Sequence, residues 1–302
     1  MHNDYHIPVL LTEVIDGLKI KENGVYVDCT FGGGGHSRAI LEKLGKSGRL
    51  IAFDQDEDAK GNLPEDDRVL FIPHNFRHTR RFLQLHGIKE IDGLLADLGV
   101  SSHQFDEGSR GFSTRFEGAR DMRMDQRAAK TAFQVVANYS ESELHKLFEQ
   151  YGEVSNSKTL AKTIVDIRKN VSLETITGFK NGVSTAVKGN PAKYFAQVFQ
   201  ALRIEVNDEL GALKELLEQL PGFLKIGGRA AFITFHSLED RLVKVFFKEG
   251  TFDPAEDHPF QTAVKQKLFK PITKKPLEAS EEERKRNPRS RSAKLRVAER
   301  IG

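Results

Sequence analysis

A run of four glycines, residues 32–35, is the part of the chain best suited to bind a cofactor. It follows an apolar stretch that ends in Asp28, Cys29 and Thr30, and about twenty residues later a second apolar stretch ends in Asp54. Glycines let the backbone press against a ligand because no Cβ intervenes, and an acid ending the next strand can accept hydrogen bonds from ribose hydroxyls. This layout is typical of a nucleotide-type cofactor site, although glycines alone also suit a flexible surface loop.

The charges beside the glycines indicate which cofactor binds. Dinucleotide sites place a pyrophosphate at a helix N-terminus, and Asp28 would repel that anion. S-adenosyl-L-methionine carries an ammonium and a sulfonium group instead, and these cations suit an acidic strand end. We therefore expect an S-adenosylmethionine site in which Asp54 bonds the ribose.

Asp97 ends another apolar stretch and begins the segment DLGVSSHQ, residues 97–104. Open α/β sheets bind ligands at the carboxyl ends of their strands, so this segment is expected to face the glycine loop. The alternative is an Asp that only caps the following turn.

The segment HSLEDR, residues 236–241, follows a fifth apolar stretch and places His236 where substrate is expected to enter. Ser237 or Asp240 could instead cap a helix that begins at Leu238. In a second charged patch, residues 120–125, Arg123 could grip a phosphate or brace the surrounding structure.

Cys29 is the single cysteine, so the chain has neither an internal disulfide framework nor a cysteine-rich zinc site, and no metal site is expected. A thiolate nucleophile would serve cytosine-C5 chemistry. A small buried residue on the cofactor strand is the favoured interpretation, so covalent cysteine catalysis is not expected.

The apolar stretches alternate with helical ones, which predicts a parallel α/β sheet. The expected strands are residues 27–30, 50–53, 69–72, 93–97 and 229–235, with a late strand, residues 294–298, closing an edge. Residues 37–44 are expected to form the first crossover helix.

Helical periodicity replaces this alternation between residues 108 and 200. Ser140 and Glu143 form a capping-box pattern, and apolar residues follow at helical spacing. We interpret residues 108–200 as a helical domain inserted after the fourth strand, with apolar stripes that pack together and a substrate-recognition or lid role. Residues 1–107 and 201–302 then form a discontinuous catalytic domain, and a long helical region spans residues 195–220.

Composition indicates a soluble enzyme: 38% of residues are hydrophobic and 29% are charged. No run of eighteen apolar residues and no N-terminal leader pattern occur, so a cytoplasmic protein without a membrane partner is expected. The net charge is only +3, but residues 265–300 carry thirteen Lys or Arg against five Glu, which leaves −5 for the remainder. This segment is expected to contact a polyphosphate backbone. It could instead be a solvated face, or Arg289 and Arg291 could brace the late strand.

Eight motifs in order along nearly the whole chain resemble the signatures of one family, the bacterial small-subunit ribosomal RNA cytosine-N4 methyltransferases. The motifs are HIPVLL (residues 6–11), TFGGGGHS (30–37), DLGVSS (97–102), RGFS (110–113), DMRMD (121–125), FQALRI (199–204), FHSLEDR (235–241) and NPRSRS (287–292).

The resemblance implies a class I methyltransferase core, a Rossmann-like sheet with an inserted helical domain, that methylates a cytosine in the decoding region of 16S rRNA within the small ribosomal subunit. By position, the implied S-adenosylmethionine contacts are Gly34, Gly35, His36, Asp54, Phe76, Asp97 and Gln104. His36 could contribute only its backbone amide. The oligomeric state does not follow from the sequence.

Asp97 is the leading candidate for binding the cytosine amine, and His236 is the second. The chain departs from the family pattern at Arg120, where an apolar residue is more common, and in the longer segment before Phe199. The competing hypotheses are a methyltransferase for DNA or protein and a non-catalytic RNA-binding ribosome assembly factor.

Overall fold

A computed structural model describes residues 8–253 and 267–302. The chain forms two compact units. Unit 1 comprises Met1–Gly99 and Gly211–Gly302, and unit 2 comprises Val100–Leu210. Three parts of the sequence predictions lie outside the described residues. They are the N-terminal segment in which no leader pattern was found, the first two residues of the HIPVLL motif, and residues 265–266 of the basic segment.

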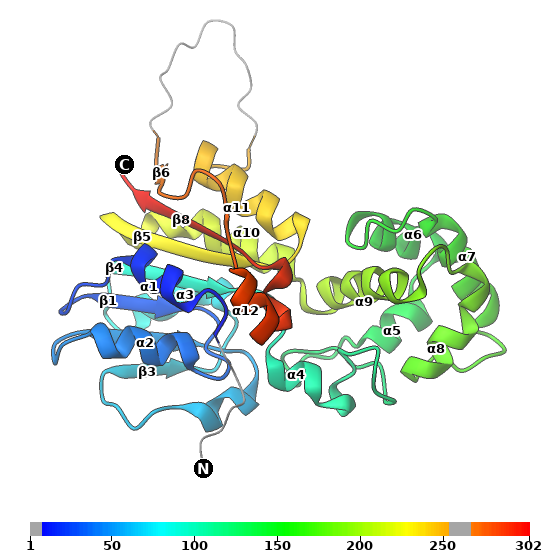
Figure 1. The fold of residues 1–302 in the computed structure, drawn as a ribbon. Coiled ribbons are helices and arrows are strands. Elements are labelled where there is room, and N and C mark those ends of the chain that lie inside the picture. The colour runs from blue at the N-terminus through cyan, green and yellow to red at the C-terminus, as the bar shows by residue number, and fades with distance from the viewer. Residues whose placement is uncertain (1–7, 254–266) are drawn as a thin grey trace, which may run out of the picture. The chain divides into compact units, whose positions relative to one another are not determined.

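Unit 1 is built on one sheet with strand order β3-β2-β1-β4-β5-β8-β6 (Figure 1). The first five strands in space pair in parallel, as the sequence predicts. They are β1 (Val25–Asp28), β2 (Arg49–Phe53), β3 (Val69–Ile72), β4 (Ile91–Asp97) and β5 (Leu224–Thr234). The strand order reverses between β1 and β4, so the loops after these two strands meet at the ligand-binding position of an open α/β sheet.

The late strand, β8 (Lys294–Arg300), does not close an edge, so that expectation is wrong. It runs antiparallel between β5 and β6 (Phe269–Pro271), and β7 (Leu277–Glu278) also pairs with it. The sequences of β6 and β7 are FKP and LE. Strands this short carry no apolar periodicity, which is why the pattern did not predict them.

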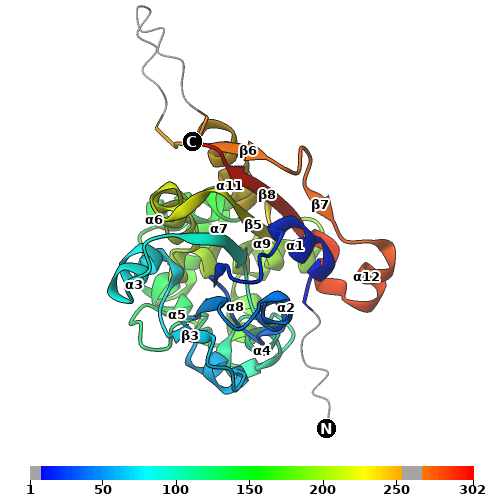
Figure 2. The same ribbon diagram turned by 90° about the vertical axis from the view of Figure 1, so that its left-hand side faces the viewer.

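Helices cover both faces of the sheet, and strand residues therefore alternate between two apolar layers. Tyr26 and Leu50 pack with α1 (Leu11–Leu18) and α2 (Gly35–Lys43) on one face. The other face packs against α3 (Thr79–Leu85), α10 (Glu209–Gln219) and α11 (Ser237–Glu249). Figure 2 shows α1 and α2 from the side.

Unit 2 is helical, and its apolar stripes pack into one cluster of their own, as expected. Its helices are α4 (Ser102–Asp106), α5 (Ala132–Asn138), α6 (Glu141–Gln150), α7 (Ser157–Ile167), α8 (Ile176–Gly182) and α9 (Pro191–Asn207). The capping box of Ser140 and Glu143 begins α6 as predicted. The long helical region is two helices, because Asp208 adopts a left-handed conformation (φ 48°) between α9 and α10.

The remaining elements are short. They are α12 (Glu281–Arg286) and the 3-10 helices η1 (Glu57–Asn62), η2 (Phe76–His78), η3 (Gly108–Arg110), η4 (Ser184–Ala186), η5 (Leu220–Gly222) and η6 (Pro288–Ser292). Over residues 8–253 and 267–302, no helix is long and apolar enough to cross a membrane.

Two arginines of unit 2 make contacts within that unit. Arg123 forms an ion pair with Asp121 at 2.7 Å and donates to the carbonyls of Gln126 and Ala128, so it braces this loop. Arg120 is fully buried, with its guanidinium carbon 4.2 Å from the centre of the Phe179 ring. Its Nη2 donates to the Leu173 carbonyl, whereas Nε and Nη1 have no hydrogen-bond partner among the described residues.

Burial lowers the pKa of Arg120 to about 9, so the charged guanidinium is costly at this position. We expect Arg120→Met to raise the free energy of unfolding by about 1–4 kcal/mol, the gain seen when buried ionic groups are replaced by apolar ones of similar volume. Urea denaturation followed by circular dichroism measures this change.

Arg168→Met is the matched control in the same unit. Arg168 donates to the carbonyls of Val136 and Tyr139 at 3.1 and 2.6 Å, so its replacement should destabilise the protein. Equal destabilisation by both substitutions would contradict the conclusion that the Arg120 charge is a net cost.

Candidate functional site

The glycine loop connects β1 to α2 and has a conformation that requires glycine. Gly34 caps α2 with φ 73°, a left-handed conformation that disfavours other residues. At Gly35 an added Cβ would lie 2.3 Å from the Pro8 ring. The backbone conformation of the loop therefore depends on glycine at these positions.

Asp28, the last residue of β1, forms hydrogen bonds with both ends of this loop. Its side chain is 1% exposed and accepts hydrogen bonds from the Thr30 amide at 3.0 Å and the Ser37 hydroxyl at 2.7 Å. Burial raises the pKa of Asp28, and the two hydrogen bonds oppose that rise. Asp28 thus joins the first residues of the loop to the first turn of α2. Its carboxylate lies next to the glycines.

Asp54 fastens the other side of the loop to the end of β2. Its Oδ2 accepts from the Gly32 amide at 2.7 Å, and its Oδ1 accepts from the Asp56 amide at 2.9 Å. Burial raises the pKa of Asp54 to about 6, against the lowering effect of these backbone donors. Each carboxylate oxygen can accept a further bond, so Asp54 can hold the loop and still receive a ribose hydroxyl.

Asp97 ends β4 at the point where the strand order reverses. Its amide donates to the Thr30 hydroxyl at 2.7 Å, which places the Asp97 carboxylate beside the glycine loop. The carboxylate Oδ1 is buried without a hydrogen-bond partner among the described residues, so the turn-capping alternative is wrong. Burial raises the pKa of Asp97 well above its usual value, and the negative charges of Asp28 and Glu239 raise it further.

His36 lies next to Asp97, with its Nδ1 3.7 Å from Asp97 Oδ2. The His36 Nε2 lies 2.9 Å from the Val9 carbonyl, so we assign the ring proton to Nε2. Burial lowers the pKa of His36 to about 4, so the ring is neutral at physiological pH. The side chain therefore has a role that the sequence left open, since it binds the segment before α1, and its ring lies beside the carboxyl end of β4.

His236 and Glu239 form the turn after β5. His236 is the N-cap of α11, accepting from the Glu239 amide at 3.4 Å, so the expectation that Ser237 or Asp240 caps this helix is wrong. Asp240 is bound instead by Arg296, at 2.6 and 2.9 Å. Glu239, which sequence reasoning missed, is buried, accepts from the Phe235 amide at 2.8 Å, and contributes negative charge toward Asp97.

The two remaining predicted contacts lie in different units. Phe76 begins η2, soon after β3, and is partly buried against the sheet core of unit 1. Gln104 belongs to unit 2, where its side chain completes a capping box with Ser101 at the start of α4. Cofactor contacts by Phe76 and Gln104 stay predictions.

The residues of unit 1 fit S-adenosylmethionine. The loop brings glycine backbone to the end of β1, Asp54 retains acceptor capacity, and Asp97 presents a buried carboxylate oxygen that lacks a partner in the described part of the chain. A bound cation would offset the cost of that buried acid. An anionic ligand at the same position would face the charges of Asp28, Asp97 and Glu239.

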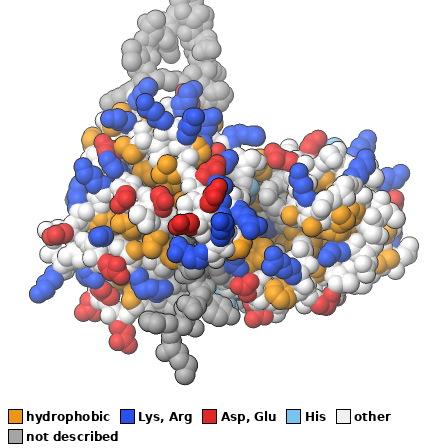
Figure 3. Space-filling view, in the orientation of Figure 1, with side chains coloured by type: hydrophobic (Ala, Val, Ile, Leu, Met, Phe, Trp, Pro, Cys, Tyr) orange, Lys and Arg blue, Asp and Glu red, His pale blue; other side chains and the backbone are white. Residues whose placement is uncertain are grey.

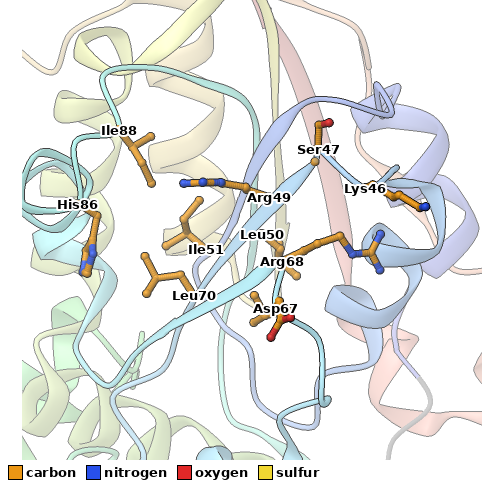
Figure 4. A pocket seen from close by; sticks show the side chains of 12 residues that line it. Lys46, Ser47, Arg49, Leu50, Ile51, Asp67, Arg68, Leu70, His86 and Ile88 are labelled. Carbon is orange, nitrogen blue, oxygen red and sulfur yellow. The ribbon is translucent and has the colours of Figure 1, made fainter.

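A separate cavity of about 620 Å³ lies at the opposite end of the strands, where β2 and β3 begin (Figure 4). Its walls include Lys46, Arg49, Asp67, Leu70 and Ile88. None of the predicted cofactor contacts lines this cavity, so it is not the predicted site.

Asp54→Ala is expected to weaken S-adenosylmethionine binding about ten- to a hundredfold, because a lost charge-assisted hydrogen bond costs about 1.5–3 kcal/mol. The raised pKa adds a pH dependence. Below a pKa of about 6 Asp54 gains a proton, so affinity should fall as the pH drops through 6 and this fall should vanish in the variant. Titration calorimetry between pH 5 and 8 measures both effects.

Asp67→Ala is the control, since Asp67 is an exposed acid at the opposite end of the strands. Unchanged affinity in Asp54→Ala would remove Asp54 from the cofactor site.

Cys29→Ser should leave methyl transfer largely intact, with Cys29→Ala as a second variant that adds no buried hydroxyl. The Cys29 thiol is buried, and burial followed by the Asp28 charge raises its pKa well above the usual value, so the thiolate is disfavoured. Single-turnover methyl transfer and a denaturing gel for a covalent RNA adduct test this. Lost activity with folding and cofactor binding preserved, or a trapped adduct, would overturn it.

The comparisons with known proteins agree with the sequence motifs. The model of the MraW methylase family matches residues 3–301. Proteins named ribosomal RNA small subunit methyltransferase H are 53% identical in Azobacteroides pseudotrichonymphae and 50% identical in Parabacteroides distasonis. Each match covers 98% of this chain and 98% of the relative. The family resemblance is confirmed, and the chain belongs to the MraW methylase family.

Proposed function

We propose that the protein transfers a methyl group from S-adenosylmethionine to the exocyclic N4 amine of a cytosine in the decoding region of 16S rRNA, within the small ribosomal subunit in the cytoplasm. The observation that carries this proposal is the carboxylate oxygen of Asp97 beside the glycine loop, which is buried and has no partner within residues 8–253 and 267–302. It provides a hydrogen-bond acceptor where the cofactor loop and the end of β4 meet.

The acceptor molecule is supported by the relatives and by the motifs. The relatives are named for methylation of small-subunit ribosomal RNA, and their similarity extends over almost the entire chain. The choice of cytosine N4 rests on the family resemblance of the eight motifs. DNA or protein as acceptor, or a role without catalysis, has no comparable support.

An exocyclic cytosine amine is a weak nucleophile because its lone pair is delocalised into the ring. When bound, S-adenosylmethionine supplies a methyl group on a positively charged sulfur, which is left as a neutral thioether. As the amine nitrogen forms its new bond to carbon it must give up one proton. A carboxylate that accepts a hydrogen bond from the amine can localise the lone pair and then take that proton.

Asp97 has the properties that this step requires. Its raised pKa makes the carboxylate a stronger proton acceptor than an exposed Asp. The hydrogen bond from its amide to Thr30 fixes its backbone, and the neutral His36 ring lies against Oδ2. Oδ1 is left to receive a hydrogen bond from the amine. His236 stays the second candidate, although its ring already caps α11.

Mass spectrometry of nucleosides from 16S rRNA tests the function directly. RNA from cells that lack the protein should lose N4-methylated cytidine, and the purified protein with S-adenosylmethionine should restore it. An unchanged nucleoside profile, or methyl transfer to DNA or protein alone, would reject the proposed acceptor.

Asp97→Asn is expected to lower the single-turnover rate of methyl transfer about 10²–10³-fold while RNA binding changes little, since the amide keeps the shape but cannot take the proton. His236→Asn is the control, because Asn is a good N-cap and preserves the start of α11 without the imidazole. Wild-type rates in Asp97→Asn with a large loss in His236→Asn would transfer the role to His236.

A further inference from the structure

Part of the basic segment near the C-terminus lies where the parallel strands of unit 1 end, which is here termed the catalytic edge. Lys294, the first residue of β8, pairs with Thr234 at the carboxyl end of β5. Because α12 and η6 immediately precede β8, they lie at the edge where the parallel strands end (Figure 1). The glycine loop and Asp97 occupy the same edge.

The segment of residues 8–10 joins α12 to the glycine loop. The Glu283 carboxylate accepts a hydrogen bond from the Leu10 amide at 2.8 Å. The residue before it, Val9, binds the His36 ring through its carbonyl, and Pro8 packs against Gly35. Figure 2 shows α12 beside the start of α1. The position of α12 is therefore fixed relative to the loop.

Over α12, η6 and the start of β8, the structure separates cations that are paired or partly buried from cations that are exposed. Arg284 pairs with Glu278 at 2.8 Å, Arg289 is half-buried, and Arg296 is bound to Asp240. The ion pairs of Arg284 and Arg296 support the fold, and bracing of the late strand by Arg289 and Arg291 stays an alternative. The exposed cations are Lys285, Arg286 and Arg291, for which no acidic partner is found among the described residues.

Charge on α12 is segregated along the helix. Its first turn holds three Glu, and its last turn holds Arg284, Lys285 and Arg286. The last turn continues into η6, which adds Arg291. On the face drawn in Figure 3, Lys and Arg side chains gather over α12 and the segment that follows it. Since the chain outside residues 265–300 has a net charge of −5, attraction to a polyanion must be local.

We propose that Lys285, Arg286 and Arg291, here termed the α12 cation surface, bind the phosphate backbone of the substrate RNA and hold it beside the catalytic edge. This inference rests on the proposed function for its choice of RNA. No aromatic residue is interleaved with these cations, so the surface positions the RNA without stacking on its bases.

The test compares two triple variants that remove the same number of positive charges from opposite ends of the strands. One variant is Lys285→Gln with Arg286→Gln and Arg291→Gln. The control is Lys46→Gln with Arg49→Gln and Lys89→Gln, three exposed cations near the starts of β2 and β4, two of which are labelled in Figure 4. Binding to a 16S rRNA fragment is measured across a salt series with S-adenosylhomocysteine present, so that no methyl is transferred.

The α12 variant should reduce the steepness of the negative slope of log affinity against log salt by about 0.7 for each lost phosphate contact, or about 2 for three, and the control should leave the slope unchanged. The KM for RNA should rise with little change in kcat. An unchanged slope in the α12 variant, or equal reductions in both variants, would overturn the proposal.

Stability and function are distinguished by further measurements. The melting temperature and cofactor affinity should match wild type in the α12 variant, whereas Arg289→Gln should lower the melting temperature. The single substitutions Lys285→Gln and Arg291→Gln, each reducing the steepness of the slope by about 0.7, repeat the test with less change to the protein. Wild-type protein that binds RNA through this surface without methylating it would reject the proposed function alone.

Discussion

The burial of acids at one edge of the sheet is the constraint on which the rest of unit 1 depends. Asp28, Asp54, Asp97 and Glu239 all lie at or just after the carboxyl ends of parallel strands, where their charges repel one another. Buried carboxylates persist when donors satisfy them, and the loop and the first turn of α2 supply these donors: Thr30 and Ser37 for Asp28, and Gly32 for Asp54. The conformation of the glycine loop is therefore also the means by which the acids are accommodated.

Asp97 is the exception, since its Oδ1 remains without a donor among the described residues. An unpaired buried carboxylate favours its protonated form, whereas a neighbouring cation favours the ionised form. Binding of a cation beside Asp97 and loss of its proton are consequently linked, and each promotes the other. Under the proposed function, the burial and the neighbouring acids that raise the pKa of Asp97 also favour a cationic cofactor, so one electrostatic arrangement would serve both binding and chemistry.

Much of this site could be predicted from the sequence because it is encoded locally. Asp28, the glycines and Asp54 follow apolar stretches whose lengths set where each strand ends, and parallel pairing then brings those ends together. Glu239 could not be found in this way. Its proximity to Asp97 depends on the register of β4 against β5, in which Asp97 pairs with Ile233, and on a helix cap provided by His236. The sequence also could not show that Arg284 forms an ion pair whereas the adjacent Lys285 is exposed, because this difference depends on the tertiary contact between Arg284 and Glu278.

Residues from both terminal parts of the described chain contact one another beside the glycine loop. The segment Pro8-Val9-Leu10 packs on Gly35, binds the ring of His36 and donates to Glu283 of α12. A neutral His36 suits this position, because a charged imidazolium would need both ring nitrogens to donate and would be costly in so buried a place. The hydrogen bond from Nε2 to Val9 leaves the Nδ1 lone pair toward Asp97. His36 therefore adds no positive charge that would lower the basicity of Asp97, and its contribution is to fix the position of neighbouring segments while the acids determine the charge of the site.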